Sequence, residues 1–360
     1  MLIKQSFPLF ANEGMKNFNE RVRKIMLLDI TGLLLSLAII LASCELFTNG
    51  IEWFGKKLRF GDGVVGSIFS AVGTCLPETM IPVIAILFSQ NRKESIDIGI
   101  GAIVGAPFML STLAFFVTGA GVLVFWKKRN TGMHMITNNK IIRRDIGYFI
   151  LVYTLGISTA FIDSAVIKYM VAVLLLISYI YYIVITVKQD KTSHGELDAL
   201  YFVKYLNTKP GMAVITAQIV LALSGIVFGA HVFVQNIEEV STHIGISTLV
   251  LSLIITPIAT ELPEKFNSII WISKRKDTLA LGNITGAMVF QSCIPVAIGI
   301  FATPWELDWR AVFSAVLAIL SAALTYFWIN MKEKLSPVPL LAGGVFYVLF
   351  IGSILMTELG

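Results

Sequence analysis

Charged residues are scarce in this chain, and cysteine and histidine are scarcer still. Only 14% of the 360 residues are charged, whereas soluble domains carry about 25%. The 3 cysteines, Cys44, Cys75 and Cys293, lie in apolar segments without metal-ligand spacing, and the 4 histidines form no cluster. These shortages exclude an ordinary soluble domain, a disulfide framework and a zinc site.

Catalytic signatures are also missing. The chain holds no Walker sequence, no HExxH-type zinc pair and no nucleophile beside a base. Without such a constellation we expect no enzyme activity and no cofactor. The net charge of +5 does not indicate a nucleic-acid partner, because the basic residues are spread over several short loops rather than gathered in one patch.

Long apolar runs are what the chain has in abundance. Hydrophobic residues make up 56% of the sequence, and the mean hydropathy is +0.79. A helix needs about 20 mostly apolar residues to cross a bilayer. Such runs occur at 27–49, 63–88, 97–126, 146–162, 165–187, 212–236, 246–272, 278–301, 311–329 and 338–357. We therefore predict an all-α polytopic membrane protein with ten transmembrane helices.

The basic residues predict an orientation. They gather in alternate loops, near 56–59, 127–144, 188–209, 274–276 and 332–334. Basic loops face the cytoplasm, so both termini are predicted outside, in a prokaryotic plasma membrane. A basic stretch within the N-terminal segment 1–25 does not fit this rule, and we predict it as a short surface helix.

An internal repeat is the most informative feature of the sequence. Shifting the chain by 186 positions superimposes 42–78 on 228–264 without a gap. The shift places the pattern Thr-x-Leu-Pro-Glu at 74–78 on the same pattern at 260–264. Chance supplies scattered apolar matches, but not this polar motif twice in long apolar runs.

A second motif extends the repeat and defines the two halves. With a shift of 181, the pattern Gly-x-Ile-x-Gly at 101–105 recurs at 282–286. Five helices in each copy, an odd number, invert the second half relative to the first. We predict a first repeat over 26–187, a cytoplasmic linker over 188–210 and a second repeat over 211–360.

The first repeated motif places a carboxylate inside each of two membrane spans. An ionised carboxylate at the bilayer centre costs about 2.5–3.5 kcal/mol on insertion scales, so it is rarely kept without a role. Thr74 and Glu78 share a helix face, as do Thr260 and Glu264, because each pair is four residues apart. Each motif's proline also frees the carbonyl four residues earlier. Together the two motifs predict an oxygen-rich anionic site for a hard cation such as Ca²⁺.

Two other interpretations stay open at this point. The prolines could be simple kinks and the glutamates could pair with buried bases, although two matched copies favour the cation site. A cation channel is the second alternative, but paired motifs in inverted halves favour alternating access.

At these residues the sequence resembles the sodium/calcium exchanger family of the calcium/cation antiporter superfamily. That family carries Gly/Ala-Thr-Ser-Leu-Pro-Glu in helices 2 and 7 and Gly-Asn-x-x-Gly-Ser-Asn-x-x-Asn/Asp in helices 3 and 8. The resemblance implies a four-helix ion-binding core, against which helices 1 and 6 move, and calcium held by the two glutamates and the threonine carbonyls. The predicted cation site comprises Glu78, Glu264, Thr74, Thr260, Glu261, Gln291 and Ala71.

Several positions depart from the family pattern. The family's serines and its final asparagine or aspartate are replaced by Cys75, Glu261, Ala106, Ala287, Leu110 and Gln291. The hydroxyls that would build flanking sodium sites are therefore mostly gone. Crowded, desolvated carboxylates bind protons more readily, so a proton could replace sodium. Glu261 and Lys265 are spaced to neutralise each other.

Together these features predict a secondary antiporter that exchanges Ca²⁺ for Na⁺ or H⁺ by alternating access. Glu78 and Glu264 are its predicted central ligands, whereas the matched pair Glu52 and Glu238 is expected near helix ends. A proton-coupled or monovalent cation antiporter without true Na⁺/Ca²⁺ exchange is the alternative. Inorganic cations and the lipid bilayer are the expected partners, and we expect a monomer.

Overall fold

The computed structural model is mostly helical in the residues that it describes. These are 7–58, 75–88, 92–129, 131–189, 199–206, 209 and 211–358, with side chains at 7–25, 92, 187, 189, 205–206, 262–267 and 358 left out of the description. No β-strand occurs in these ranges. The all-α prediction is therefore confirmed for the described part of the chain.

The described helices follow one another along the chain. Their bounds are α1 Phe7–Lys57, α4 Leu76–Phe88, α5 Arg92–Met109, α6 Phe115–Phe125, α7 Asn139–Ser158, α8 Ala165–Gln189, α9 Tyr201–Leu206, α10 Met212–Ile244, α11 Thr248–Ser273, α12 Asp277–Ala302, α13 Trp309–Lys332 and α14 Pro337–Glu358. A π-helical turn, η2 (Leu110–Ala114), joins α5 to α6, and a 3₁₀ turn, η3 (Thr159–Phe161), ends α7.

A described helix lies in each of the ten predicted spans. Seven are long and apolar enough to cross a membrane: Met26–Lys57, Lys93–Phe125, Ala165–Thr186, Met212–Ile244, Asp277–Ala302, Trp309–Lys332 and Pro337–Thr357. Shorter apolar helices at Leu76–Phe88 and Thr248–Glu261 lie in the second and seventh predicted spans. The fourth predicted span is occupied by α7, whose first turns are polar.

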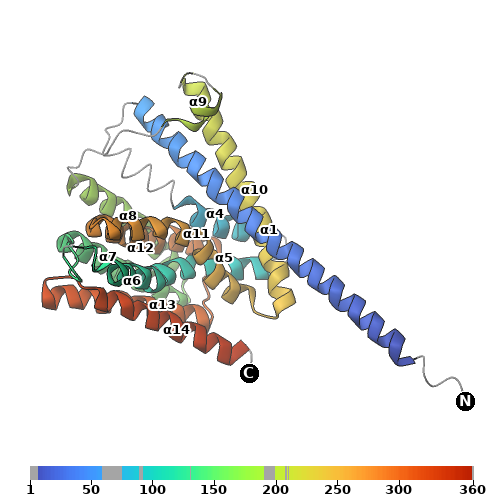
Figure 1. The fold of residues 1–360 in the computed structure, drawn as a ribbon. Helices are drawn as coiled ribbons and strands as arrows, with labels where there is room; N and C mark the ends of the chain where they lie inside the picture. Colours follow the sequence, from blue (N-terminus) through green and yellow to red (C-terminus); the bar gives the residue numbers. More distant parts are fainter. Residues whose placement is uncertain are drawn as a thin grey trace, which may run out of the picture.

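The first helices of the two halves, α1 and α10, pack along each other as a pair (Figure 1). Their apolar contact surface includes Ile40 and Phe47 on α1 and Phe233 on α10. The structure differs from the sequence prediction at the N-terminus. No separate short helix occurs there, because α1 runs without interruption from Phe7 and extends beyond the other helices (Figure 1).

Close packing of α5 against α11 explains the glycines in the first copy of the Gly-x-Ile-x-Gly motif, Gly101 and Gly105, whereas a Cβ added at Gly282 or Gly286 meets no described atom closer than 3.9 Å. A Cβ atom at Gly101 or Gly105 would meet the carbonyl oxygens of Leu249 and Leu253 on α11. The Ser252 hydroxyl donates to the carbonyl of Ile98 across the same contact, at 2.7 Å. Small residues and hydroxyls that bond across helices are the usual means of joining helices in a membrane.

The remaining contacts follow the inverted repeat. Helix α5 packs against α13, and its counterpart α12 packs against α7. Likewise α6 packs against α14, whereas α12 packs against α8. Equivalent helices of the two halves thus have equivalent neighbours, as two inverted five-helix repeats require.

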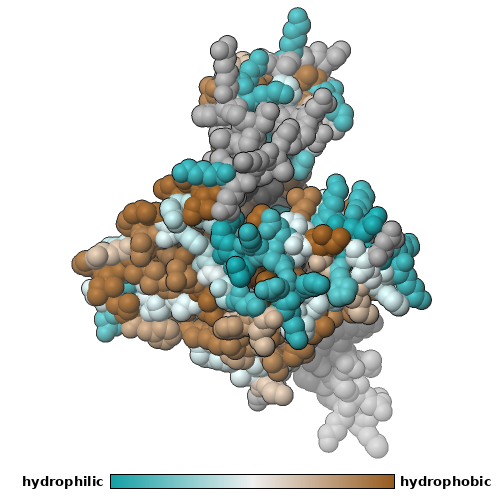
Figure 2. Space-filling model, turned by 90° about the vertical axis from the view of Figure 1, so that its left-hand side faces the viewer, coloured by the Kyte–Doolittle hydropathy of each residue, from teal (hydrophilic) through white to brown (hydrophobic). Residues whose placement is uncertain are grey.

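Three of the loops that are rich in basic residues lie on one side of the molecule. The Arg129 side chain donates to the carbonyl of Ile272, at 2.7 Å, and the Asn139 side chain donates to the carbonyl of Glu333, at 2.5 Å. Figure 2 looks onto this side and shows hydrophilic residues near its middle with hydrophobic residues around them. The exposed basic residues of these loops include Lys127, Lys128, Lys274, Arg275, Lys276, Lys332 and Lys334.

Candidate cation site

The described part of the first motif contributes one buried carboxylate. Glu78 lies in the first turn of α4 with 4% of its surface exposed, and Cys75 precedes the helix with 8% exposed. Helix α4 packs against α5, α11 and α12, so Glu78 lies in an interior surrounded by helices of both halves. The carboxylate of the first motif therefore lies in the protein interior, where acidic residues of membrane-spanning segments are usually found.

The second motif lies on α11, which continues as an α-helix past Pro263. Thr260 is fully buried, and its hydroxyl donates to the carbonyl of Thr256 one turn earlier, at 2.9 Å. A hydroxyl that donates this bond keeps lone pairs that can still bind a ligand, and the missing N–H of Pro263 leaves the carbonyl of Ala259 without its helical donor. Glu261 is also buried, with 2% exposed.

Gln291 is the most unusual polar residue of the interior. It lies on α12 with none of its surface exposed, and neither its side-chain oxygen nor its side-chain nitrogen has a hydrogen-bond partner among the described residues. A buried polar group without a partner costs about 1–3 kcal/mol. An amide that accepts this cost is typical of a site that a ligand completes.

The structure describes some residues of the predicted site and not others. Glu78, Thr260, Glu261 and Gln291 are all buried. Ala71 and Thr74 lie outside the described residues, as does the side chain of Glu264. Within the described residues, no group of three or more His, Cys, Asp or Glu side chains is placed to hold a metal ion. The coordination of a cation by the two glutamates therefore stays a prediction.

The first half has Leu110 where the second half has Gln291, whereas both halves have alanine at the family's serine position, Ala106 and Ala287. Leu110, the repeat counterpart of Gln291, is fully buried in the hydrophobic core, and so is Ala106. The helix changes to a π-helical turn at Leu110, and the carbonyl of Ser111 in this turn accepts a hydrogen bond from the hydroxyl of Ser321 on α13, at 2.5 Å. No sequence pattern predicts this turn.

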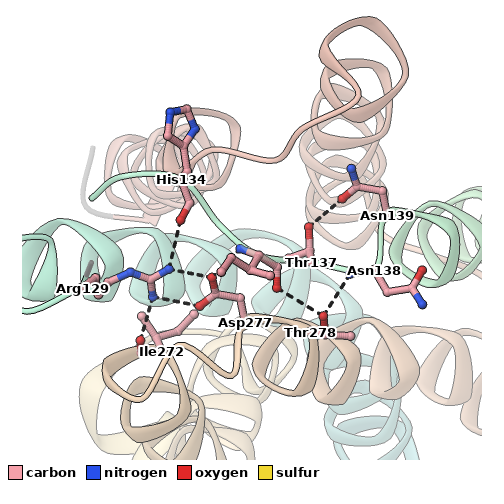
Figure 3. A network of polar contacts seen from close by, with 9 residues as sticks. Arg129, His134, Thr137, Asn138, Asn139, Ile272, Asp277 and Thr278 are labelled. Atoms are coloured by element: carbon pink, nitrogen blue, oxygen red, sulfur yellow. Dashed lines mark hydrogen bonds and ion pairs between the residues drawn. The ribbon is translucent and has the colours of Figure 1, made fainter. Parts of the chain in front are cut away.

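A buried ion pair fixes the ends of the helices that carry the second half of the site. The Arg129 guanidinium binds both carboxylate oxygens of Asp277, at 2.8 and 2.6 Å. Arg129 also donates to Ile272 at the end of α11 and to His134, while the backbone N–H of Ile136 donates to Asp277 (Figure 3). The network holds the segment after α6 against the turn between α11 and α12.

A second buried acid joins α7 to α12. Asp145 is 2% exposed, accepts two hydrogen bonds from Arg144 at 3.0 and 2.8 Å, and accepts one from the Thr285 hydroxyl at 3.0 Å. Sequence reasoning missed both Asp277 and Asp145, because each lies at the edge of an apolar run and belongs to no repeated motif.

The family model described as "Sodium/calcium exchanger protein" matches residues 28–188 and 214–357. A putative antiporter, CaxA of Alkalimonas amylolytica, is 25% identical over 331 residues, which cover 91% of this chain and 98% of that protein. An uncharacterised membrane protein of Methanocaldococcus jannaschii is 24% identical over 337 residues, which cover 93% and 100% of the two chains.

Solved structures share the fold. A crystal structure of the H⁺/Ca²⁺ exchanger CAX superimposes with a TM-score of 0.68 at 16% identity, covering 92% of this chain and 86% of that one. The sodium-calcium exchanger NCX_Mj, soaked with Na⁺ and Sr²⁺, gives a TM-score of 0.55 at 20% identity, covering 91% and 99%. This chain therefore shares the fold of these two exchangers.

Proposed function

Because this chain belongs to the sodium/calcium exchanger family, we propose that it is a secondary antiporter that moves Ca²⁺ across a membrane in exchange for H⁺ or Na⁺. Membership of the family supports cation antiport in general. The ligands and the counter-ion are the finer part of the proposal, and they rest on the residues of the interior.

The observation that carries the ligand assignment is the burial of Gln291 with no described partner, in an interior that also holds Glu78. Glu78 and Glu264 would supply the negative charge for a divalent ion, and Gln291 would supply a neutral oxygen. The carbonyls of Thr74 and Thr260, with the nearby Ala71 and Glu261, complete the proposed site. Carboxylate, amide and carbonyl oxygens are the ligands that Ca²⁺ prefers.

A proton is the counter-ion that the side chains favour over sodium. A flanking sodium site in the first half would need oxygen ligands, but Ala106 and Leu110 there are both buried and apolar. Glu261 adds a third carboxylate to the proposed site, after Glu78 and Glu264, and a carboxylate can carry a proton. One of these carboxylates would carry the returning proton.

The distribution of basic residues would place the basic loops in the cytoplasm and both termini outside, in a plasma membrane. A monomer suffices, because both halves of the site come from one chain. The kinetics of Ca²⁺ uptake distinguish an antiporter from the alternative, a channel. Ca²⁺ uptake into proteoliposomes that saturates and depends on an opposing cation gradient supports the proposal, whereas uptake that follows only the membrane potential contradicts it.

A further inference from the structure

A cluster of buried amide side chains fastens the linker helix α9 to the paired helices α1 and α10. Asn49 lies near the end of α1 with 6% exposed, and Gln218 lies near the start of α10 with none exposed. Figure 1 shows α9 beside these two helix ends. Neither amide belongs to the repeated motifs, and the proposed cation site uses neither.

The two amides hold the first backbone N–H groups of α9. Tyr201 N–H donates to the Asn49 side-chain oxygen at 3.1 Å, and Phe202 N–H donates to the Gln218 side-chain oxygen at 2.9 Å. The first N–H groups of a helix have no partner within it. Side chains of two other helices therefore satisfy the start of α9.

The same amides join α1 to α10. The Gln218 nitrogen donates to the carbonyl of Leu46 at 2.8 Å and to the Asn49 oxygen at 3.1 Å. The Tyr201 hydroxyl adds a bond to the Glu45 carboxylate at 2.7 Å. Asn49 and Gln218 each bond to both of the other two helices, so separating any one helix leaves buried polar groups unsatisfied.

We propose that Asn49 and Gln218 are positioning residues that make α1, α9 and α10 one rigid unit, so that the linker helix travels with the α1–α10 pair during exchange. This inference rests on the proposed alternating access, in which the first helix of each half moves against the core. The linker between the repeats then joins the moving unit at α9 and the core at the end of α8. A ligand or protein that held α9 would hold the moving helices as well.

Two cysteine pairs, bridged by a short bifunctional thiol reagent, test the inference. Glu45→Cys with Tyr201→Cys joins α1 to α9, and Ser95→Cys with Glu238→Cys joins α5 to α10, where Ser95 donates to Glu238 at 2.9 Å. The native cysteines are buried, and reagent-treated unsubstituted protein is the control. We expect Ca²⁺ uptake within twofold of the uncrosslinked variant for the first pair and at least a tenfold loss for the second. Loss with the first pair, or full uptake with the second, overturns the proposal.

Spin-label distances give a readout that needs no transport activity. Labels at Lys57 and Lys204 report on α1 and α9, and a label at Lys332 reports on α13, which packs against the core helix α5. On adding Ca²⁺, the Lys57–Lys204 distance should stay constant while both distances to Lys332 change together.

Gln218→Leu should broaden the Lys57–Lys204 distance distribution, whereas Gln235→Leu, at an exposed position of the same helix, should not. A Lys57–Lys204 distance that changes as much as the others, or three distances that never change, overturns the rigid unit. Absence of Ca²⁺ transport with the expected distance changes would instead contradict the proposed function.

Discussion

The guanidinium of Arg129 and the carboxylate of Asp277 lie 2.6 Å apart, and both side chains are fully shielded from solvent. Asp277 is the first residue of α12, where a negative charge suits the helix dipole. Arg129 also binds a carbonyl at the end of α11, where a positive charge is favoured. One ion pair thus satisfies the facing ends of two helices that carry proposed ligands.

Removing one member of this pair should destabilise the protein strongly. Arg129→Leu leaves a buried carboxylate without its cation, which costs about 3–5 kcal/mol. Arg310→Leu is the control, because its pair with Asp308 is partly exposed and such pairs contribute about 0–1 kcal/mol. Thermal unfolding in detergent measures both. The interpretation fails if the two variants lower the melting temperature equally.

The central site predicts that charge at two glutamates is indispensable. Glu78→Gln and Glu264→Gln should each abolish Ca²⁺ uptake and leave a folded protein, because too few anionic ligands remain for a dehydrated divalent ion. Glu52→Gln is the control, since Glu52 lies near the end of α1 as predicted and should keep most of the uptake. Flux in proteoliposomes, with size-exclusion profiles to show folding, checks the result. Near-normal uptake by either of the first two variants would refute the assignment.

The contact between α5 and α11 predicts a steric effect at Gly105. A Cβ there meets the Leu253 carbonyl and the Pro257 ring, so Gly105→Val should separate the helices and cost about 1–3 kcal/mol. Gly352→Val on α14, where no described atom lies within 4 Å of the added Cβ, should leave the melting temperature nearly unchanged. Equal stability of the two variants would argue against close packing at this contact.

Orientation is testable by labelling. Cysteines placed at Lys128, Lys276 and Lys334 lie on the side of the molecule that the basic residues assign to the cytoplasm. Intact cells should protect all three from a membrane-impermeant thiol reagent, whereas a cysteine at Glu306, between α12 and α13, should be labelled. Labelling of the three basic-loop positions with protection at Glu306 reverses the orientation.

Much of the fold could be predicted because membrane spans are long and leave a strong compositional signal. The internal repeat predicted which helices of the two halves correspond. It also matched Glu52 with Glu238, and both lie near helix ends. The continuous α1 was missed because charged residues in 17–26 suggested a surface segment, although charge alone does not end a helix. The π-helical turn at Leu110 was missed because apolar periodicity over five residues cannot distinguish it from an α-helix.

The site was predictable only as far as its motifs are repeated. Thr260 belongs to the repeated motif and is buried, whereas Glu261 is buried at the variable position of the motif, where the other half has Cys75. Arg129 and Asp277 were not predictable, because 148 residues separate them and no local pattern links an arginine after one helix to the start of another. The amides Asn49 and Gln218 were missed because single polar residues at helix ends are common, and no local pattern shows which of them meet.

Ca²⁺ uptake into proteoliposomes, with the Na⁺ gradient and the pH gradient imposed separately, tests the proposed exchange most directly. With Ala106, Leu110 and Ala287 in place of oxygen ligands, uptake should depend steeply on the pH gradient and weakly on Na⁺. The combined variant Ala106→Ser, Leu110→Asn, Ala287→Ser and Gln291→Asp should raise the dependence on Na⁺. A steep, saturable Na⁺ dependence of the unmodified protein at constant pH would contradict proton coupling, and the absence of Ca²⁺ uptake under either gradient would contradict calcium exchange itself.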